Sequence, residues 1–157
     1  MSILNRSLEN DKIKSVDGSM LITSKYTAGI GNERFLRKLQ ENEEIIGSYC
    51  PKCNKSFLPA RHFCERCLTR LEENRVAPRE GILASHTEVT IDLDGNPLPS
   101  PKRVGLVTFK GFEGGIIHTL SAKDPKKIRI GAKVRALFKP KAKRTGSILD
   151  IECFEPV

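Results

Sequence analysis

The 157-residue sequence predicts a mainly β protein with a short helical part near its N-terminus. Two observations lead to this fold class. Four of the five cysteines form two C-x-x-C pairs, which is the pattern of a small metal-bound ribbon. After them come five short segments that are rich in β-branched residues and separated by turn signals, as in a small barrel.

The pattern divides the chain into four parts. They are an N-terminal extension (1–28), a helix (29–46), the cysteine ribbon (47–72) and the barrel (73–157). In the helix, Phe35, Leu36 and Leu39 form one apolar stripe. We expect Asn32 to cap its start and Gly47 to follow its end.

The cysteine pairs are Cys50 with Cys53 and Cys64 with Cys67. Two such pairs can present four thiolates to one tetrahedral ion, and zinc suits four sulfur ligands, with iron as the minor alternative. Because four sulfurs saturate the ion and leave no position for water, we expect a structural metal. A thioredoxin-type redox motif would need a βαβ unit, and the sequence predicts none.

The remaining cysteine and the histidines receive ordinary interpretations. His62 lies between the two pairs and could replace a ligand, but four cysteines already complete the set. His86 and His118 fall in strand patterns. Cys153 lies on an apolar strand face, so we expect a buried, inert thiol; no base can be assigned to it as a nucleophile.

The barrel is expected to be an OB-fold, because five short strands close without leaving exposed sheet edges. Its segments are GILASHTEVT, VGLVTFKGF, GIIHTLSA, KVRALFKP and SILDIECFEP. Val134, Ala136 and Phe138 are expected to share one face, and Leu149, Ile151 and Cys153 to share another. OB-folds bind ligands with the loops between strands 1 and 2 and strands 4 and 5, here Ile91–Arg103 and Lys139–Gly146.

Positive charge is concentrated at the C-terminal end. Residues 1–100 carry 14 Lys+Arg and 14 Asp+Glu, whereas residues 101–157 carry 13 against 5 and hold the whole net charge of +8. Ten basic residues and one acid lie between Lys123 and Arg144. Such a patch suits nucleic acid, an acidic protein or the phosphates of a cofactor, unless it is only a solvated surface.

Several classes of protein are disfavoured. No apolar run approaches the roughly 20 residues of a membrane helix, and the polar N-terminus does not look like a secretory signal, so we expect a cytoplasmic protein without membrane contact. There is no P-loop, dinucleotide fingerprint or Ser-His-Asp order. The chain therefore reads as a binding module rather than an enzyme.

The order of helix, ribbon and barrel resembles one family. The matching stretches are ERFLRKL, IIGSYCPKC, SFLPARHFCERC, GILASHTEV, VGLVTF and KIRIGAKVRALF. Phe57, Pro59 and Arg61 also fit the family pattern between the knuckles, as do Gly131 and Val134 before the fourth strand. From about Tyr26 to Pro156, the chain resembles the acyl-CoA-associated OB-fold family, once catalogued as a domain of unknown function, which has an N-terminal rubredoxin-like zinc ribbon.

This resemblance implies a non-catalytic scaffold that contributes to a shared CoA or acyl-CoA site beside a thiolase-type enzyme. For archaeal members, the implied partners are acetoacetyl-CoA thiolase and hydroxymethylglutaryl-CoA synthase, which open the mevalonate route to isoprenoids. Other members pair with different thiolase-like proteins. Residues 1–25 depart from the family pattern, so the choice of partner could differ.

The phosphates of CoA would meet basic loop residues. The candidates are Arg61, Lys102, Arg103, Lys139, Lys141, Lys143 and Arg144. The alternative function is nucleic-acid binding, since ribbons and basic OB-folds are common there. Against it stands a poor supply of stacking aromatics, with no Trp and two Tyr, and Phe109, Phe112 and Phe138 assigned to the core.

Overall fold

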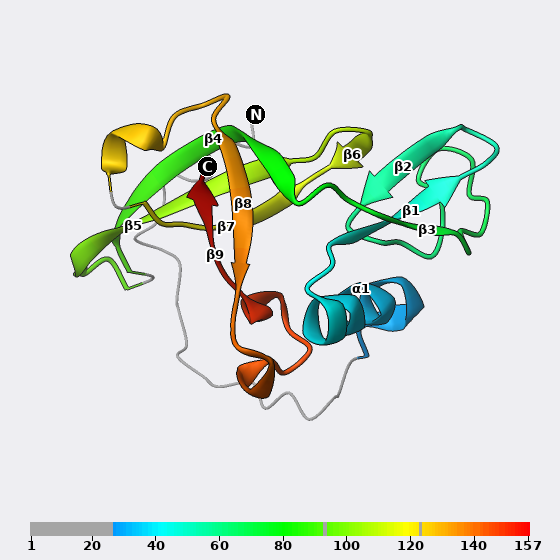
Figure 1. Ribbon diagram of the computed structural model, residues 1–157, viewed down its shortest axis with the longest axis horizontal. Coiled ribbons are helices and arrows are strands. Elements are labelled where there is room, and N and C mark those ends of the chain that lie inside the picture. Colours follow the sequence, from blue (N-terminus) through cyan, green and yellow to red (C-terminus); the bar gives the residue numbers. More distant parts are fainter. Residues whose placement is uncertain (1–26, 93, 123) are drawn as a thin grey trace, which may run out of the picture.

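The computed structural model describes residues 27–92, 94–122 and 124–157, and two small sheets with one helix make up the fold (Figure 1). Most of the predicted extension, residues 1–28, lies outside the described residues. One sheet belongs to the ribbon and has the strand order β3-β1-β2-β6; the other closes into a barrel with the order β4-β5-β7-β9-β8. No helix in these ranges is long and apolar enough to cross a membrane.

Helix α1, Gly29–Asn42, begins where the predicted range 29–46 begins and ends before residue 46, but it starts ahead of the expected cap at Asn32. Its N-cap is Ala28, without a side-chain hydrogen bond, so the assignment of Asn32 as the cap is wrong. The reason is tertiary: a Cβ at Gly31 would lie 2.7 Å from the carbonyl carbon of Arg61, so this turn of the helix lies directly against the ribbon. Phe35 and Leu39 are buried as expected.

Helix α1 ends at Glu43, whose φ of 59° is left-handed, and Gly47 plays no part in the cap. Instead, Gly47 lies in β1, Ile46–Cys50. A side chain there would collide with the Phe57 carbonyl and the Phe112 ring. The glycine is therefore required by packing between strands rather than by the helix end.

The ribbon sheet draws on segments beyond residues 47–72. Strand β1 pairs antiparallel with β2, Lys55–Leu58, and with β3, Asn74–Val76. Its fourth strand is β6, Phe112–Gly114, which comes from the middle of the barrel sequence and pairs parallel with β2. Figure 1 shows β6 leaving the barrel to reach the ribbon.

The barrel has the five strands that the sequence predicts. They are β4 (Glu80–Ile91), β5 (Pro97–Thr108), β7 (Ile116–Leu120), β8 (Lys133–Phe138) and β9 (Ile151–Pro156). Three short 3-10 turns connect them, namely η3 (Pro125–Lys127), η4 (Lys141–Lys143) and η5 (Ile148–Asp150). The prediction of a five-stranded closed barrel is confirmed.

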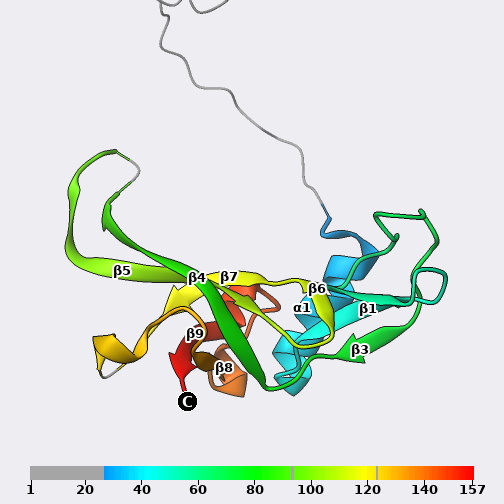
Figure 2. The same ribbon diagram turned by 90° about the horizontal axis from the view of Figure 1, so that it is seen from above.

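The first predicted ligand loop is mostly strand. Strand β4 ends at Ile91 and strand β5 already begins at Pro97, so most of the predicted loop that the structure describes belongs to β5. Strand β4 pairs with β8 only at residues 80–82, and β5 pairs with β7 only at residues 103–107. Beyond these residues, the two strands continue as a two-stranded arm that stands away from the barrel (Figure 2). Turn signals such as Pro99 and Pro101 concealed this continuation.

The last strand also begins later than expected. Leu149 lies in η5 with 61 % of its surface exposed, so it does not share the buried face of Ile151 and Cys153. Asp150, which is fully buried, causes the change, because its carboxylate accepts hydrogen bonds from the amides of Thr145 and Gly146, both at 2.8 Å. The carboxylate holds this turn and prevents an earlier start of the strand.

One apolar core runs from the barrel to the helix. The barrel interior contains Leu83, Val107, Val134, Ile151 and Phe154, and α1 and the ribbon's Ile46 and Leu58 pack onto the same cluster. A second, small cluster lies in the ribbon and consists of Cys50, Phe57, Cys64 and Leu71. The ribbon end therefore buries little apolar surface of its own, so a metal would add most of its stability.

The junction of ribbon and barrel can be tested at Gly114. Its φ is +91°, and a Cβ there would strike the Leu58 carbonyl, whereas Gly111 has a φ of +85° with open space around it. Each Gly→Ala change should cost about 1–2 kcal/mol for the left-handed backbone. We expect Gly114→Ala to lose about 2 kcal/mol more in chemical unfolding, from the clash. Equal losses would show that β2 and β6 are not tightly apposed.

Candidate functional site

The four predicted metal ligands form one cluster. The Sγ atoms of Cys50, Cys53, Cys64 and Cys67 all lie within 4.8 Å of one another. Cys50 Sγ lies 3.5 Å from Cys67 Sγ, and Cys64 Sγ lies 3.8 Å from Cys53 Sγ. Sulfur atoms bound tetrahedrally to zinc are about 3.8 Å apart, given Zn–S bonds of about 2.3 Å. The donor set therefore fits a zinc ion at its centre.

The surroundings of the sulfurs also favour a cation. The contact with the Cys67 sulfur and burial raise the pKa of Cys53 to about 12, so this thiol needs a cation beside it to ionise at neutral pH. Thr69 acts in the opposite direction. Hydrogen bonds from its hydroxyl, 3.2 Å from Sγ, and from its backbone lower the pKa of Cys67 to about 6.

The backbone shapes both cysteine pairs in the same way. The residue after each pair, Asn54 or Leu68, has a left-handed φ, of 52° and 58° respectively. This turn lets the amide of Cys53 approach Cys50 Sγ at 3.4 Å, and it lets the Leu68 amide donate to the Cys64 carbonyl at 2.9 Å. Both pairs thus form tight knuckles that point their sulfurs toward one centre.

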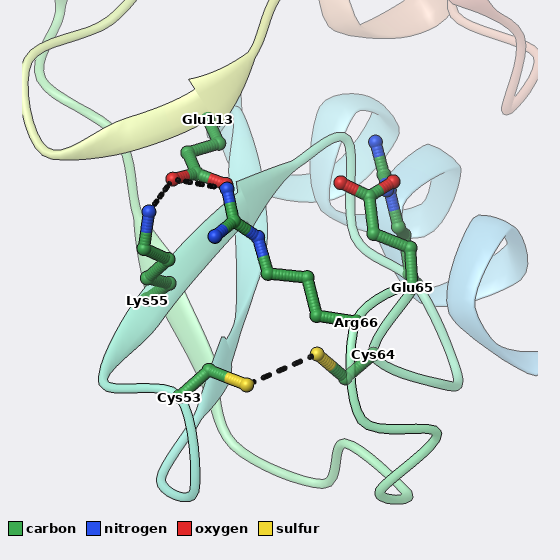
Figure 3. A network of polar contacts seen from close by, with 7 residues as sticks. Cys53, Lys55, Cys64, Glu65, Arg66 and Glu113 are labelled. Atoms are coloured by element: carbon green, nitrogen blue, oxygen red, sulfur yellow. Dashed lines mark hydrogen bonds and ion pairs between the residues drawn. The ribbon is translucent and has the colours of Figure 1, made fainter.

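An ion-pair network joins the metal knuckles to the barrel segment (Figure 3). Glu113 on β6 accepts from Lys55, which follows the first knuckle, and from Arg66 in the second knuckle, at 3.1 Å. The hydrogen bond from Lys55 and the charge of Arg66 lower the pKa of the Glu113 carboxyl. Any displacement of the second knuckle would therefore act directly on β6.

The other cysteine and histidines lie outside the metal cluster. Cys153 is buried in the barrel, and burial raises the pKa of its thiol, which agrees with the expectation of an inert residue. His118 is buried against Phe154, with ring centroids 6.1 Å apart, and burial lowers its pKa. His86 is exposed on the arm. His62 packs edge-on against Phe63.

The structure separates the seven basic residues predicted for CoA phosphates. Lys139, Lys141 and Lys143 remain together on the loop that follows β8 (Figure 1). Lys141 and Lys143 are exposed, and none of the three forms an ion pair with a described residue. Lys102 on β5 is likewise exposed without an ion pair to a described residue, so these three lysines differ by lying together on one loop.

Arg144 differs from its neighbours because its side chain is only 5 % exposed. Its guanidinium donates to the carbonyls of Lys139 at 2.6 Å and Gln40 at 3.1 Å, and it pairs with Glu43. The Gln40 amide donates back to the Arg144 carbonyl at 3.3 Å. Arg144 therefore braces the loop against α1, and its charge is already used inside the protein.

The remaining three predicted residues lie elsewhere. Arg61 is in the ribbon, where its guanidinium stacks 5.3 Å from the Phe57 ring and pairs with Glu65. Lys102 and Arg103 lie within strand β5 rather than in a loop, and Arg103 pairs with Glu88 at 2.6 Å. Figures 1 and 2 both show the arm extending away from α1 and from the loop after β8.

A groove of about 580 Å³ lies beside the lysine loop. Its walls come from the end of α1, from the connection between β3 and β4, and from β8. Apolar and charged side chains share its lining, and the apolar ones include Ile45, Ala77, Ala136 and Phe138. Phe138 directly precedes Lys139, so the groove ends where the lysine loop begins.

Most charged groups around the groove are neutralised by neighbours. Glu44 pairs with Lys38 at 3.4 Å, Glu80 with Lys133 at 3.5 Å, and Glu43 with Arg144. The groove thus offers an apolar strip with balanced rims and three available lysines at one end. This combination suits an elongated ligand with an apolar arm and an anionic head.

Sequence reasoning missed a second basic surface. Lys126, Lys127 and Arg129 line a hollow of about 760 Å³ at the other end of β8. The sequence includes them in the basic stretch from Lys123 to Arg144, but the OB-fold pattern predicts ligand contacts in the loops 91–103 and 139–146. The sequence signal for this surface is the segment 126–133, KKIRIGAK, in which basic residues lie on both sides of Ile130.

The aromatic residues assigned to the core lie there. Phe109 is buried, and Phe112 and Phe138 pack partly buried against the main core. None of the three presents an exposed ring for stacking on bases. An aromatic side chain that is exposed, Phe63, lies in the ribbon instead.

Four clustered cysteines on a ribbon, followed in the chain by a closed five-stranded barrel, define a zinc-ribbon OB-fold protein. Family models agree: "ChsH2, rubredoxin-like zinc ribbon domain" matches residues 41–72, and "ChsH2, C-terminal OB-fold domain" matches residues 74–139. Together these ranges cover more than half of the chain, which therefore belongs to the ChsH2 family, also called DUF35. The resemblance and fold class predicted from the sequence are confirmed.

Two solved structures are similar to the chain. One, from Sulfolobus solfataricus, is described as a DUF35-family protein of unknown function; it is 28 % identical, with a TM-score of 0.62 over 80 % of this chain and 84 % of that chain. The other is described as an Ltp2-ChsH2(DUF35) aldolase; it is 19 % identical, with a TM-score of 0.59 over 84 % and 98 %, and shares the fold. No curated protein matches.

The metal site predicts about one zinc ion per chain with four thiolate ligands. Cys64→Ser should lose most of the bound zinc, since serine is a poor ligand for this ion, and the ribbon should unfold around it. Cys153→Ser is the matched control and should keep its zinc. Elemental analysis and the absorption spectrum of the cobalt-substituted protein measure both. Full zinc content in Cys64→Ser would contradict the four-cysteine site.

The brace predicts that Arg144→Ala lowers the free energy of unfolding by about 2–3 kcal/mol, because buried charged hydrogen bonds are lost. Arg144→Lys should not restore it, since an ammonium cannot reach three acceptors in fork geometry. The exposed neighbour is the control, and Lys143→Ala should change stability by less than about 0.5 kcal/mol. If urea unfolding gave similar losses for Arg144→Ala and Lys143→Ala, the interpretation that Arg144 holds the loop against α1 would be wrong.

Proposed function

We propose that the chain is a non-catalytic subunit of an acyl-CoA-processing enzyme assembly and that it contributes part of a CoA site. Membership in the ChsH2 family and the fold shared with the Ltp2-ChsH2(DUF35) aldolase support the assembly role. The observation that carries the proposal for this chain is the apolar groove with three available lysines at its end.

The groove and the lysine loop correspond to the two chemical parts of CoA. The pantetheine arm is long and mostly apolar, and it would lie along Ala77, Ala136 and Phe138. The diphosphate and 3′-phosphate are anionic, and they would meet Lys139, Lys141 and Lys143. Arg144 is buried between this loop and α1, where it holds the loop in place, and it is not a phosphate ligand in the proposal.

Two observations support the non-catalytic role in this proposal. Four cysteines fill the coordination sphere of a zinc ion and leave no position for a substrate. Cys153 is buried with a raised pKa, so it is a poor nucleophile at neutral pH. We therefore place the chemistry on the partner enzyme, while this chain positions the ligand.

In its specific form, the proposal follows the archaeal members of the family. The chain would bridge acetoacetyl-CoA thiolase and hydroxymethylglutaryl-CoA synthase, in the early steps of isoprenoid biosynthesis, inside the cytoplasm. A shared CoA site between two such enzymes would let an acyl-CoA product reach the second enzyme without mixing with bulk solvent. Another thiolase-like enzyme would use the same groove.

CoA binding tests the groove. In the purified complex, Lys141→Ala/Lys143→Ala should weaken CoA binding by roughly tenfold, as measured by calorimetry, because two charge-assisted contacts are lost. Lys102→Ala/Lys110→Ala removes the same charge from exposed positions elsewhere and should bind normally. Equal affinity of both variants and wild type would exclude the lysine loop from the site.

The partner is tested by tagging the chain, recovering it from nuclease-treated lysate of its own organism, and identifying the proteins that accompany it. A thiolase and a hydroxymethylglutaryl-CoA synthase in simple ratios would support the bridging form. Recovery of ribosomal or polymerase subunits, or loss of every companion after nuclease digestion, would favour the nucleic-acid alternative. Steep salt dependence of oligonucleotide binding would point the same way.

A further inference from the structure

The barrel has a second basic surface at the end opposite the groove. Strand β8 runs from Lys133 to Phe138, so its two ends are about 17 Å apart at roughly 3.3 Å per residue. Phe138 lines the groove, and Lys133 lines the hollow of about 760 Å³, so the two cavities lie at opposite ends of β8. A ligand in the groove would leave this hollow uncovered.

The charges around the hollow are largely uncompensated. Lys126, Lys127 and Arg129 are exposed, and none forms an ion pair with a described residue. Lys133 pairs with Glu80 at 3.5 Å, and Asp124 is the single acid that lines the hollow. The surface therefore carries a net positive charge that the described part of the fold does not neutralise.

The backbone here is not arranged to hold a phosphate. The amide of Lys126 donates to the Asp124 carboxylate at 3.0 Å, and the amide of Lys127 donates to the Asp124 carbonyl at 3.1 Å. The Gly131 amide donates to the Leu83 carbonyl at 2.8 Å. Phosphate sites usually converge several free N–H groups on one anion, and these amides are already occupied.

Two exposed apolar side chains lie among the basic residues of the same surface. Ile130 is 67 % exposed and Val157 is 63 % exposed, and both line the hollow. An apolar centre with a charged rim is the usual composition of a protein–protein interface. The cationic rim selects a partner surface that carries Asp and Glu around an apolar contact.

We propose that the surface formed by Lys126, Lys127, Arg129, Ile130 and Val157 docks the acidic surface of a partner protein. The inference goes beyond the CoA groove, because it concerns the opposite end of the barrel and needs no CoA. The two sites together would let one barrel hold a ligand at one end and a protein at the other.

Zero-length carbodiimide cross-linking tests this directly, because the reagent joins lysine amines to carboxylates in contact. The tagged full-length chain is cross-linked in nuclease-treated lysate of its own organism, and the joined peptides are identified by mass spectrometry. We expect amide bonds from Lys126 or Lys127 to Asp or Glu residues of one partner protein. Lys126→Glu/Lys127→Glu should lower recovery of that partner by at least about tenfold.

Lys102→Glu/Lys110→Glu reverses two exposed charges elsewhere and should recover the partner normally. Recovery by Lys126→Glu/Lys127→Glu equal to wild type, or no cross-link at either lysine, would overturn the docking surface. CoA or an oligonucleotide could also be added before cross-linking. If either one abolished both recovery of the partner and cross-linking at Lys126 and Lys127, the surface would bind a phosphate ligand and the docking proposal would be overturned. Cross-linking to a protein that is not an acyl-CoA enzyme would support docking while the proposed function fails.

Discussion

The pairing of β2 with β6 fixes how the ribbon and the barrel sit against each other. Strand β6 lies between two barrel strands in the sequence, yet it forms the edge of the ribbon sheet by pairing with Ser56, Phe57 and Leu58 of β2. Gly114 brings the two backbones close, and Glu113 ties β6 to both metal knuckles. Helix α1 then packs into the angle between the two sheets. The position of the groove follows from this arrangement, because α1 forms one of its walls.

Charge is used in two different ways along the basic C-terminal part. The two arginines near the ends of β8 form ion pairs within the protein: Arg135 pairs with Glu155 at 2.9 Å on the surface, and the buried Arg144 pairs with Glu43. The lysines at both ends of β8 stay available to solvent. An arginine fork favours fixed, multiple acceptors inside the fold, whereas lysines suit changeable contacts at the surface. Net charge alone could not have separated these roles.

The sequence predicted the features that depend on local spacing. The four cysteines, the apolar stripe of α1 and the five barrel strands all repeat over short distances. It could not predict what depends on distant contacts. Arg144 looks like any other loop cation until Gln40 and Glu43 are placed beside it, 104 and 101 residues away. Likewise, the need for a glycine at position 31 depends on the ribbon backbone at Arg61, which lies against this turn of the helix.

The arm formed by β4 and β5 has a consequence for solubility. A strand edge without a neighbour offers its free amides to other chains, and such edges start the stacking of β-sheets into aggregates. Here Pro97, Pro99 and Pro101 occupy every second position of the outer part of β5, and none has an amide hydrogen to give. An incoming strand would find an interrupted hydrogen-bond ladder along this part of β5, which disfavours strand addition there.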